Sequence, residues 1–248
     1  MKKELSMLLA AAVLATLFSG CGTTAKFVYP ARMDDLVQVA SAPVHNQTVA
    51  VTPFDDFRNQ DNTSGTFFLY MIPLMPFGWV EYDRPDAARL FVTINSYDFT
   101  PAEDLPKAAA VSLRRSNLFK DAFFTFGGEK DRADLVLHGK IRSTKYLGRV
   151  WSYGLSLYGP LFWWLGAPCG NSVDTLSLQF ELTRKGKVIW DYTFDRSDST
   201  VQGLYYYSGH DCLGYSRLMQ DAMNQAITDL ARRLRENSDL LKDAPDKN

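Results

Sequence analysis

Residues 173–194 read VDTLSLQFELTRKGKVIWDYTF, two runs of alternating apolar and polar residues joined by a short basic turn. Successive side chains of a β-strand point to opposite faces, so the apolar residues from Leu176 to Leu182 share one face. The turn at 184–187 contains a glycine, and the apolar residues from Val188 to Phe194 return in register. The stretch therefore predicts an antiparallel hairpin with one buried face.

Residues 215–234 predict a long amphipathic helix, because apolar side chains recur there at a spacing of three and four residues. The apolar face of such a helix packs against a core while its polar face meets solvent. We expect this helix to close the core over the hairpin. Residues 241–248 are expected to form a disordered tail.

Segments upstream of the hairpin supply further strands and a second helix. Proline after Thr100, with acids in the first turn, predicts a helix start at this point, and a start at Asp104 with Pro106 in the first turn is the alternative. Alternation and β-branched content predict strands over 48–54, 90–99, 118–126 and 134–147. We therefore expect a single α+β domain over 46–240, a mainly antiparallel sheet with at least two helices packed on one face.

Residues 1–20 have the parts of a secretory signal peptide. The chain starts with basic residues, continues with an almost wholly apolar run over 5–18, and reaches two small residues just before Cys21. The apolar run is shorter than the roughly 20 residues that a membrane-spanning helix needs. We therefore expect export and removal of residues 1–20.

The residues LFSGC at 17–21 resemble the lipobox of bacterial lipoproteins. This resemblance implies cleavage before Cys21 and covalent lipid such as palmitate on that cysteine, with the membrane as a partner. Gly22 in place of aspartate implies the outer membrane at its periplasmic face, with the inner membrane as the alternative. Residues 21–45 are then expected to form a lipidated tether.

The charge and cysteine content further limit the expected binding partners and cross-links. The chain has 27 Lys and Arg against 28 Asp and Glu, a net charge of −1, which argues against the basic stripe of a nucleic-acid-binding protein. With Cys21 lipidated, Cys169 and Cys212 remain. An oxidising compartment makes them candidates for one disulfide, and two separate thiols are the alternative.

Three short segments, TVAVTPFDD at 48–56, LRRSNLF at 113–119 and ADLVLHGK at 133–140, carry a second resemblance. They are similar to segments of a group of envelope proteins that includes the TolB amino-terminal domain, the curli secretion lipoprotein CsgG and the penicillin-binding-protein activator LpoB. The resemblance implies an α+β domain used for envelope assembly, secretion or regulation rather than for catalysis.

Residues 151–168, WSYGLSLYGPLFWWLGAP, are rich in aromatic side chains and predict a strand-turn-strand ribbon bent at Gly159. The apolar segment 67–80 contains two prolines and is expected beside it. Aromatic residues are enriched at membrane interfaces but also fill cores, so core packing, a partner or oligomer surface, and membrane contact stay open. The candidate contact residues are Phe77, Trp79, Trp151, Tyr153, Phe162, Trp163 and Trp164.

Motifs that carry catalysis are weak in this sequence. The three histidines are spread out, metal-ligand spacing is lacking, and there is no glycine-rich phosphate loop. We expect a non-enzymatic protein without metal or cofactor, which binds an envelope protein or itself as an assembly or transport accessory. The alternative is a subunit of an oligomeric outer-membrane secretion channel whose aromatic segments insert in the bilayer.

Overall fold

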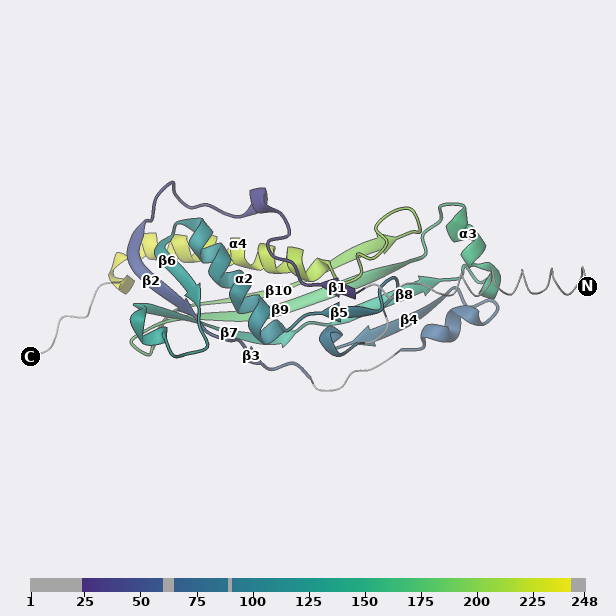
Figure 1. Ribbon diagram of the computed structural model, residues 1–248, viewed down its shortest axis with the longest axis horizontal. Coiled ribbons are helices and arrows are strands. Elements are labelled where there is room, and N and C mark those ends of the chain that lie inside the picture. The colour runs from purple at the N-terminus through teal and green to yellow at the C-terminus, as the bar shows by residue number, and fades with distance from the viewer. Residues whose placement is uncertain (1–23, 60–64, 89–90, 242–248) are drawn as a thin grey trace, which may run out of the picture.

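The computed structural model describes residues 24–59, 65–88 and 91–241. The expected signal peptide and the lipidation site Cys21 lie outside these residues, as does the tail from residue 242 onward. The described residues form an elongated α+β structure, with α3 (Pro160–Trp164) near one end (Figure 1). Among its helices, none is both long and apolar enough to cross a membrane.

The expected hairpin is the centre of the sheet. Strand β9 (Gly170–Arg184) pairs antiparallel with β10 (Lys187–Gln202) along its full length. The opposite edge of β9 pairs antiparallel with β8 (Tyr146–Trp151) near its start and with β7 (Leu135–Ser143) near its end. The hairpin prediction is therefore confirmed, and the hairpin is longer than the alternation alone indicated.

Parallel strands complete the sheet beside β7. β2 (His45–Val51) lies parallel to both β7 and β6 (Phe119–Phe124), and β3 (Asp55–Asp56) also pairs parallel with β7. β4 (Phe77–Tyr82) pairs antiparallel with β8. The expected α+β class with a mostly antiparallel sheet is confirmed, but the parallel part was not predicted. It arises because α2 (Pro101–Ser116) connects β2 to β6, and parallel neighbours need such a crossover.

Two long helices pack on the sheet. α2 contacts β2 and β6, α4 (Gly214–Glu236) contacts β9 and β10, and the two helices contact each other. The start of α2 is as expected, and the Asp104 carboxylate accepts a hydrogen bond from the Thr100 backbone N–H at 2.7 Å. The shorter elements are β1 (Thr24–Lys26), β5 (Ser96–Asp98), η1 (Met33–Asp35), η2 (Phe67–Met71), η3 (Pro85–Ala87), η4 (Lys130–Arg132), η5 (Ser156–Tyr158) and η6 (Ser238–Leu241).

The core face of β9 is the one that the alternation predicted. Its apolar residues from Leu176 to Leu182 are fully buried, and Phe180 packs edge-on against Phe54 with ring centroids 5.8 Å apart. On β10, the Trp190 indole N–H donates a hydrogen bond to the Asp229 carboxylate of α4 at 3.0 Å. The long hairpin and α4 therefore share one continuous core.

Two predicted strands are wrong in extent. Of the described residues 91–99 in the first of these, only Ser96–Asp98 belong to a strand. The Thr93 backbone N–H instead donates a hydrogen bond to the Asp211 carboxylate at 2.8 Å, so it is not available to a ladder. The run expected over 134–147 is divided between β7 and β8, which pair with different parts of β9.

The tether expected over 21–45 is wrong from Thr24 onward. β1 pairs parallel with β5, and the residues that follow lie along the helices (Figure 1). On α4, the side-chain oxygens of Gln220 and Asn224 accept hydrogen bonds from backbone N–H groups of this segment at 3.0 and 2.9 Å. Hydrogen bonds to side-chain amides that are distant in the sequence hold the segment. Such bonds leave no periodic pattern in the sequence. We call residues 24–45 the N-terminal arm.

Replacing Leu178 by alanine tests the central role of β9. We expect the Leu178→Ala variant to lose about 2–5 kcal/mol of unfolding free energy, because a fully buried leucine leaves a cavity. Urea unfolding followed by circular dichroism measures the loss. Asp195→Ala, an exposed position on the neighbouring strand, is the control and should change stability by less than about 0.5 kcal/mol. Equal effects in the two variants would contradict the assignment.

Candidate binding site at the apolar tip

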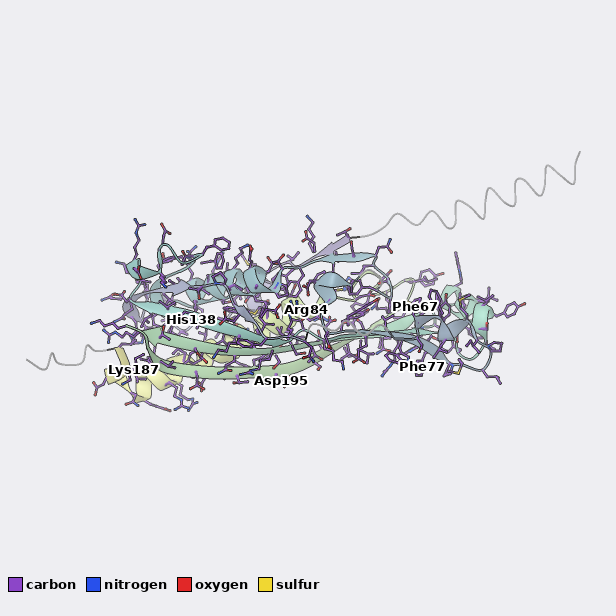
Figure 2. The ribbon with its side chains drawn as sticks, turned by 90° about the horizontal axis from the view of Figure 1, so that it is seen from below. Phe67, Phe77, Arg84, His138, Lys187 and Asp195 are labelled. Atoms are coloured by element: carbon purple, nitrogen blue, oxygen red, sulfur yellow. The ribbon has the colours of Figure 1, made fainter. Side chains whose placement is uncertain are left out.

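Two apolar segments far apart in the sequence meet at one end of the molecule. Residues 65–80 form η2 and most of β4, and residues 150–168 run from the end of β8 through η5 and α3. Neither segment contains Asp, Glu, Lys or Arg. Figure 2 labels Phe67 and Phe77 toward this end and Lys187 at the opposite end. We call residues 65–80 and 150–168 the apolar tip.

The apolar tip exposes large side chains that folded proteins usually bury. Leu74 is 88% exposed and Leu165 82%, and three aromatic side chains are more than 60% exposed, namely Phe68, Tyr158 and Trp164. Single exposed apolar residues are ordinary, whereas a contiguous patch of them marks an interaction surface. These five side chains therefore do not pack in the core of the protein.

The seven predicted contact residues divide into two groups. Exposed side chains belong to Phe77, Tyr153, Phe162 and Trp164, whereas Trp79, Trp151 and Trp163 are half-buried. Sequence reasoning thus found part of the surface but missed its most exposed leucines. The sequence signal for these leucines is that both segments lack charged residues. This signal marks the segments as a whole but does not identify individual residues.

A half-buried tryptophan is part of the scaffold of the tip. The Trp163 indole N–H donates a hydrogen bond to the Trp151 carbonyl oxygen at 2.9 Å. This bond ties α3 back to the end of β8, so Trp163 holds the tip together while its neighbour Trp164 faces solvent.

The expected strand-turn-strand ribbon over 151–168 is wrong, because the segment forms η5 and α3 instead. Pro160 occupies the first turn of α3, where its missing N–H costs nothing. A Cβ atom at Gly159 would lie 2.4 Å from the Ser152 carbonyl oxygen. Only glycine lets the chain fold back this tightly.

Hydrogen bonds join the two segments of the tip. The Pro76 carbonyl oxygen accepts bonds from the backbone N–H groups of Ser152 and Tyr153 at 2.9 and 3.1 Å. In the other direction, the Leu74 N–H donates to the Gly154 carbonyl oxygen at 2.9 Å. Leu74 has a φ of 71°, which is uncommon for leucine. Its side chain is the most exposed large apolar side chain of the tip.

A groove lies beside η2. It has a volume of about 410 Å³ and is lined mostly by apolar side chains, among them Phe67, Phe68, Ile72 and Val80. η2 approaches β4 closely here, because Gly78 leaves no side chain between them. The groove extends the apolar surface of the tip along the edge strand of the sheet.

The tyrosines between the end of β10 and the start of α4 are divided between surface and core. Tyr205 and Tyr207 are exposed, and the Tyr205 hydroxyl donates a hydrogen bond to the Trp164 carbonyl oxygen at 2.9 Å. Tyr215 is fully buried, and its hydroxyl bonds the carbonyl oxygen of Thr144 at 2.9 Å. The loop that carries Tyr205 therefore supports α3, whereas Tyr215 belongs to the core.

The expected disulfide is not formed in this structure. Cys169 and Cys212 are both buried free thiols. Burial raises the pKa of Cys169 to about 11, and burial also raises the pKa of Cys212, which lies near the acids Asp174 and Asp211. The two cysteines therefore act as small apolar core residues at neutral pH.

Two carboxyl groups are buried where β9 meets the start of α4. Asp211 accepts hydrogen bonds from Thr93 and from the Tyr146 hydroxyl. Asp174 accepts one from the Gly214 backbone N–H, while its Oδ1 has no partner among the described atoms. Burial, with nearby acids, raises the pKa of Asp174 well above its usual value. Both side chains are at most 2% exposed, which indicates a structural role.

Side chains that commonly bind metals are dispersed in the described part of the chain. Within the described ranges, no three His, Cys, Asp or Glu side chains are grouped so that they could hold a metal ion. No protein-family model and no curated protein sequence matches the chain.

Solved structures share a partial likeness in backbone. Protein XCC0632 from Xanthomonas campestris, of family DUF330, is 10% identical with a TM-score of 0.46, covering 87% of this chain and 99% of that one. A PelC dodecamer from Paraburkholderia phytofirmans is 16% identical with a TM-score of 0.39, at 77% and 92% coverage. A putative neuraminyllactose-binding hemagglutinin homolog from Helicobacter pylori is 10% identical with a TM-score of 0.38, at 89% and 97% coverage.

Alanine at Gly78 is expected to loosen the apolar tip. A Cβ atom there would lie 1.7 Å from the Phe67 carbonyl oxygen, so η2 has to move away from β4. Hydrogen–deuterium exchange should therefore speed up over residues 67–71 in the Gly78→Ala variant. The control is Gly128→Ala, where no heavy atom lies within 4 Å of the new Cβ. Unchanged exchange over 67–71 in the Gly78→Ala variant would refute this packing.

Asparagine at Asp174 is expected to stabilise the protein increasingly as the pH rises. The raised pKa keeps the folded carboxyl protonated, whereas the unfolded chain releases the proton above about pH 4. Wild-type stability therefore falls above pH 4 by up to about 1.4 kcal/mol per pH unit, until the folded pKa is reached. The asparagine side chain of the Asp174→Asn variant does not titrate, so the gain should be absent near pH 3.5 and grow towards pH 7 in urea unfolding. A gain that is the same at both pH values contradicts the assignment.

Proposed function

We propose that this protein is a lipid-anchored, non-enzymatic accessory of the cell envelope that docks through the apolar tip onto another envelope component. The observation that carries the proposal is the tip itself, in which two hydrogen-bonded segments without charged residues expose many large apolar side chains. Exposed patches of this kind mark interaction sites in soluble domains.

Charged and polar side chains outside the tip support this assignment. On the sheet face opposite the buried leucines of β9, Lys140 pairs with Glu181 at 2.6 Å, and Arg142 donates a hydrogen bond to Gln179 at 2.6 Å. His138 and Asp195 also lie along the sheet (Figure 2). Most of the exposed large apolar side chains of the described residues thus belong to the tip, although Val28, Phe57 and Phe126 are exposed elsewhere.

The anchor is proposed from the signal-peptide pattern and the lipobox resemblance at 17–21. Lipid on Cys21 confines the domain to a membrane plane, and confinement raises the effective concentration of the tip near other membrane-bound components. Modest contacts are then sufficient for docking. The proposed location is the outer membrane at its periplasmic face, and the resemblance to the TolB, CsgG and LpoB group supports a role in assembly, secretion or regulation.

The secretion-channel alternative has less support. A membrane-spanning β-strand needs about 9–11 residues. The strands that enter the tip, β4 and β8, have six residues each, and the adjoining parts of the tip are short helices. We therefore favour a docking accessory over a channel wall.

Cell fractionation and photo-cross-linking test the proposal together. We expect the full-length protein to remain with membranes after a high-salt wash and the Cys21→Ser variant to be released. A photoreactive residue at Leu165 should cross-link to an envelope protein or a lipid, whereas one at the exposed control position Asp195 should not. An intact mass of the full-length protein that shows residues 1–20 still present, or Cys21 without lipid, would refute the anchor. Equal cross-linking from both positions would refute docking by the tip.

A further inference from the structure

We propose that the component contacted by the apolar tip is the bilayer itself, with α3 and the loop before β4 inserted into its interfacial region. This inference rests on the lipid anchor of the proposed function and names the partner of the same surface. Three observations carry it: the short reach of the anchor, the internal pairing of the polar groups in the tip, and the position of the first charges.

The first observation is that the N-terminal arm leaves almost no free tether. Thr24 is already paired with Ser96 in β5, and their hydroxyl oxygens lie 2.9 Å apart. Phe27 stacks on Phe99 with ring centroids 5.0 Å apart. Cys21 precedes Thr24 by three residues, a reach of about 10 Å even when fully extended. A lipid on Cys21 therefore holds the domain against the bilayer surface.

The place where the arm begins is compatible with contact by the tip. β1 and β5 lie close to the middle of the molecule, slightly nearer to the end that carries α3 (Figure 1). The opposite end, with the β9–β10 turn, carries the basic residues of 184–187. A lipid attached just before β1 is thus somewhat nearer to the tip than to the β9–β10 turn.

The second observation is that many of the polar groups in the tip are already paired within the protein. The hydroxyls of Ser152 and Ser156 bond the carbonyl oxygens of Met75 and Met71. The Tyr153 hydroxyl donates to the Pro168 carbonyl oxygen at 2.5 Å. Protein interfaces use free donors and acceptors for recognition, about one hydrogen bond per 100–200 Å². In contact with lipid, by contrast, polar groups must be satisfied internally.

The third observation is the position of the first charged residues beyond the tip. Moving away from the tip along the two strands, the first charged residues are Arg149 and Glu81. The Arg149 guanidinium lies over the Phe77 ring, 5.8 Å from its centroid. A long cationic side chain in this position can place its charge among lipid headgroups while its stem covers apolar surface. Tryptophan and tyrosine, as at Trp164 and Tyr158, are the residues enriched at this depth.

An environment-sensitive fluorophore tests the insertion. The full-length lipidated protein is reconstituted in vesicles of phosphatidylethanolamine and phosphatidylglycerol, with the nitrobenzoxadiazole label on Leu165→Cys. The matched control carries the label on Lys187→Cys at the opposite end (Figure 2). Cys169 and Cys212 are buried with raised pKa values, so the label goes to the introduced thiol. We expect blue-shifted emission and quenching by spin-labelled lipids at position 165 and neither at 187.

The outcomes separate this inference from the proposed function. If the protein floats with the vesicles while the label at 165 keeps its water-like emission, insertion is wrong and a protein partner covers the tip. If the protein does not float, the anchor and the proposed function fail together. A blue shift that grows with protein concentration but resists spin-labelled lipid identifies a second copy as the occupant and overturns the inference.

A second labelling position excludes an effect of the label itself. With the fluorophore on Leu161→Cys, also in α3, the double substitution Trp164→Ser and Leu165→Ser should reduce the quenching several-fold. All three side chains are at least 60% exposed, so the variants are expected to keep the urea midpoint of the parent. Undiminished quenching in the double variant would overturn the role assigned to these side chains.

Discussion

Strand β9 is hydrogen-bonded along both of its edges, and this two-sided pairing is the constraint that organises the molecule. One edge carries β10, and the other carries β8 and then β7. The half paired with β8 leads to the apolar tip, and the half paired with β7 lies under the helices. Because one continuous strand belongs to both regions, the tip is built on the same framework as the core and is not a loose appendage. The tip is thereby held in one orientation relative to the core.

Local periodicity accounts for the parts of the fold that were predictable. The alternation around Phe180 and the helical spacing through α4 reflect side chains that face one core, so the hairpin and the last helix follow from the sequence. The conformations of the N-terminal arm and of the 90–99 region do not follow from local periodicity. Their backbones are held by single side chains from distant elements, Gln220, Asn224 and Asp211, and no local pattern encodes such pairings.

The candidate site was predictable in composition but not in exposure. Aromatic content identified residues 151–168, yet composition alone does not distinguish a buried aromatic cluster from an exposed one. Close backbone contacts decide between them here. Gly78 and Gly159 let η2 and the η5–α3 turn pack directly onto neighbouring backbone, so the space beneath them is filled by main chain. The large side chains of Leu74, Trp164 and Leu165 are left to point outward.

The N-terminal arm also bears on the order of events in biogenesis. Once β1 is paired with β5, two residues separate Cys21 from folded structure. Under the proposed anchor, an enzyme that cleaves before Cys21 would find little extended chain to bind once the arm is docked. For a chain processed at Cys21, maturation is therefore favoured while the arm is still undocked. The hydrogen bonds that hold the arm on Gln220 and Asn224 cannot form until those two late residues have been synthesised.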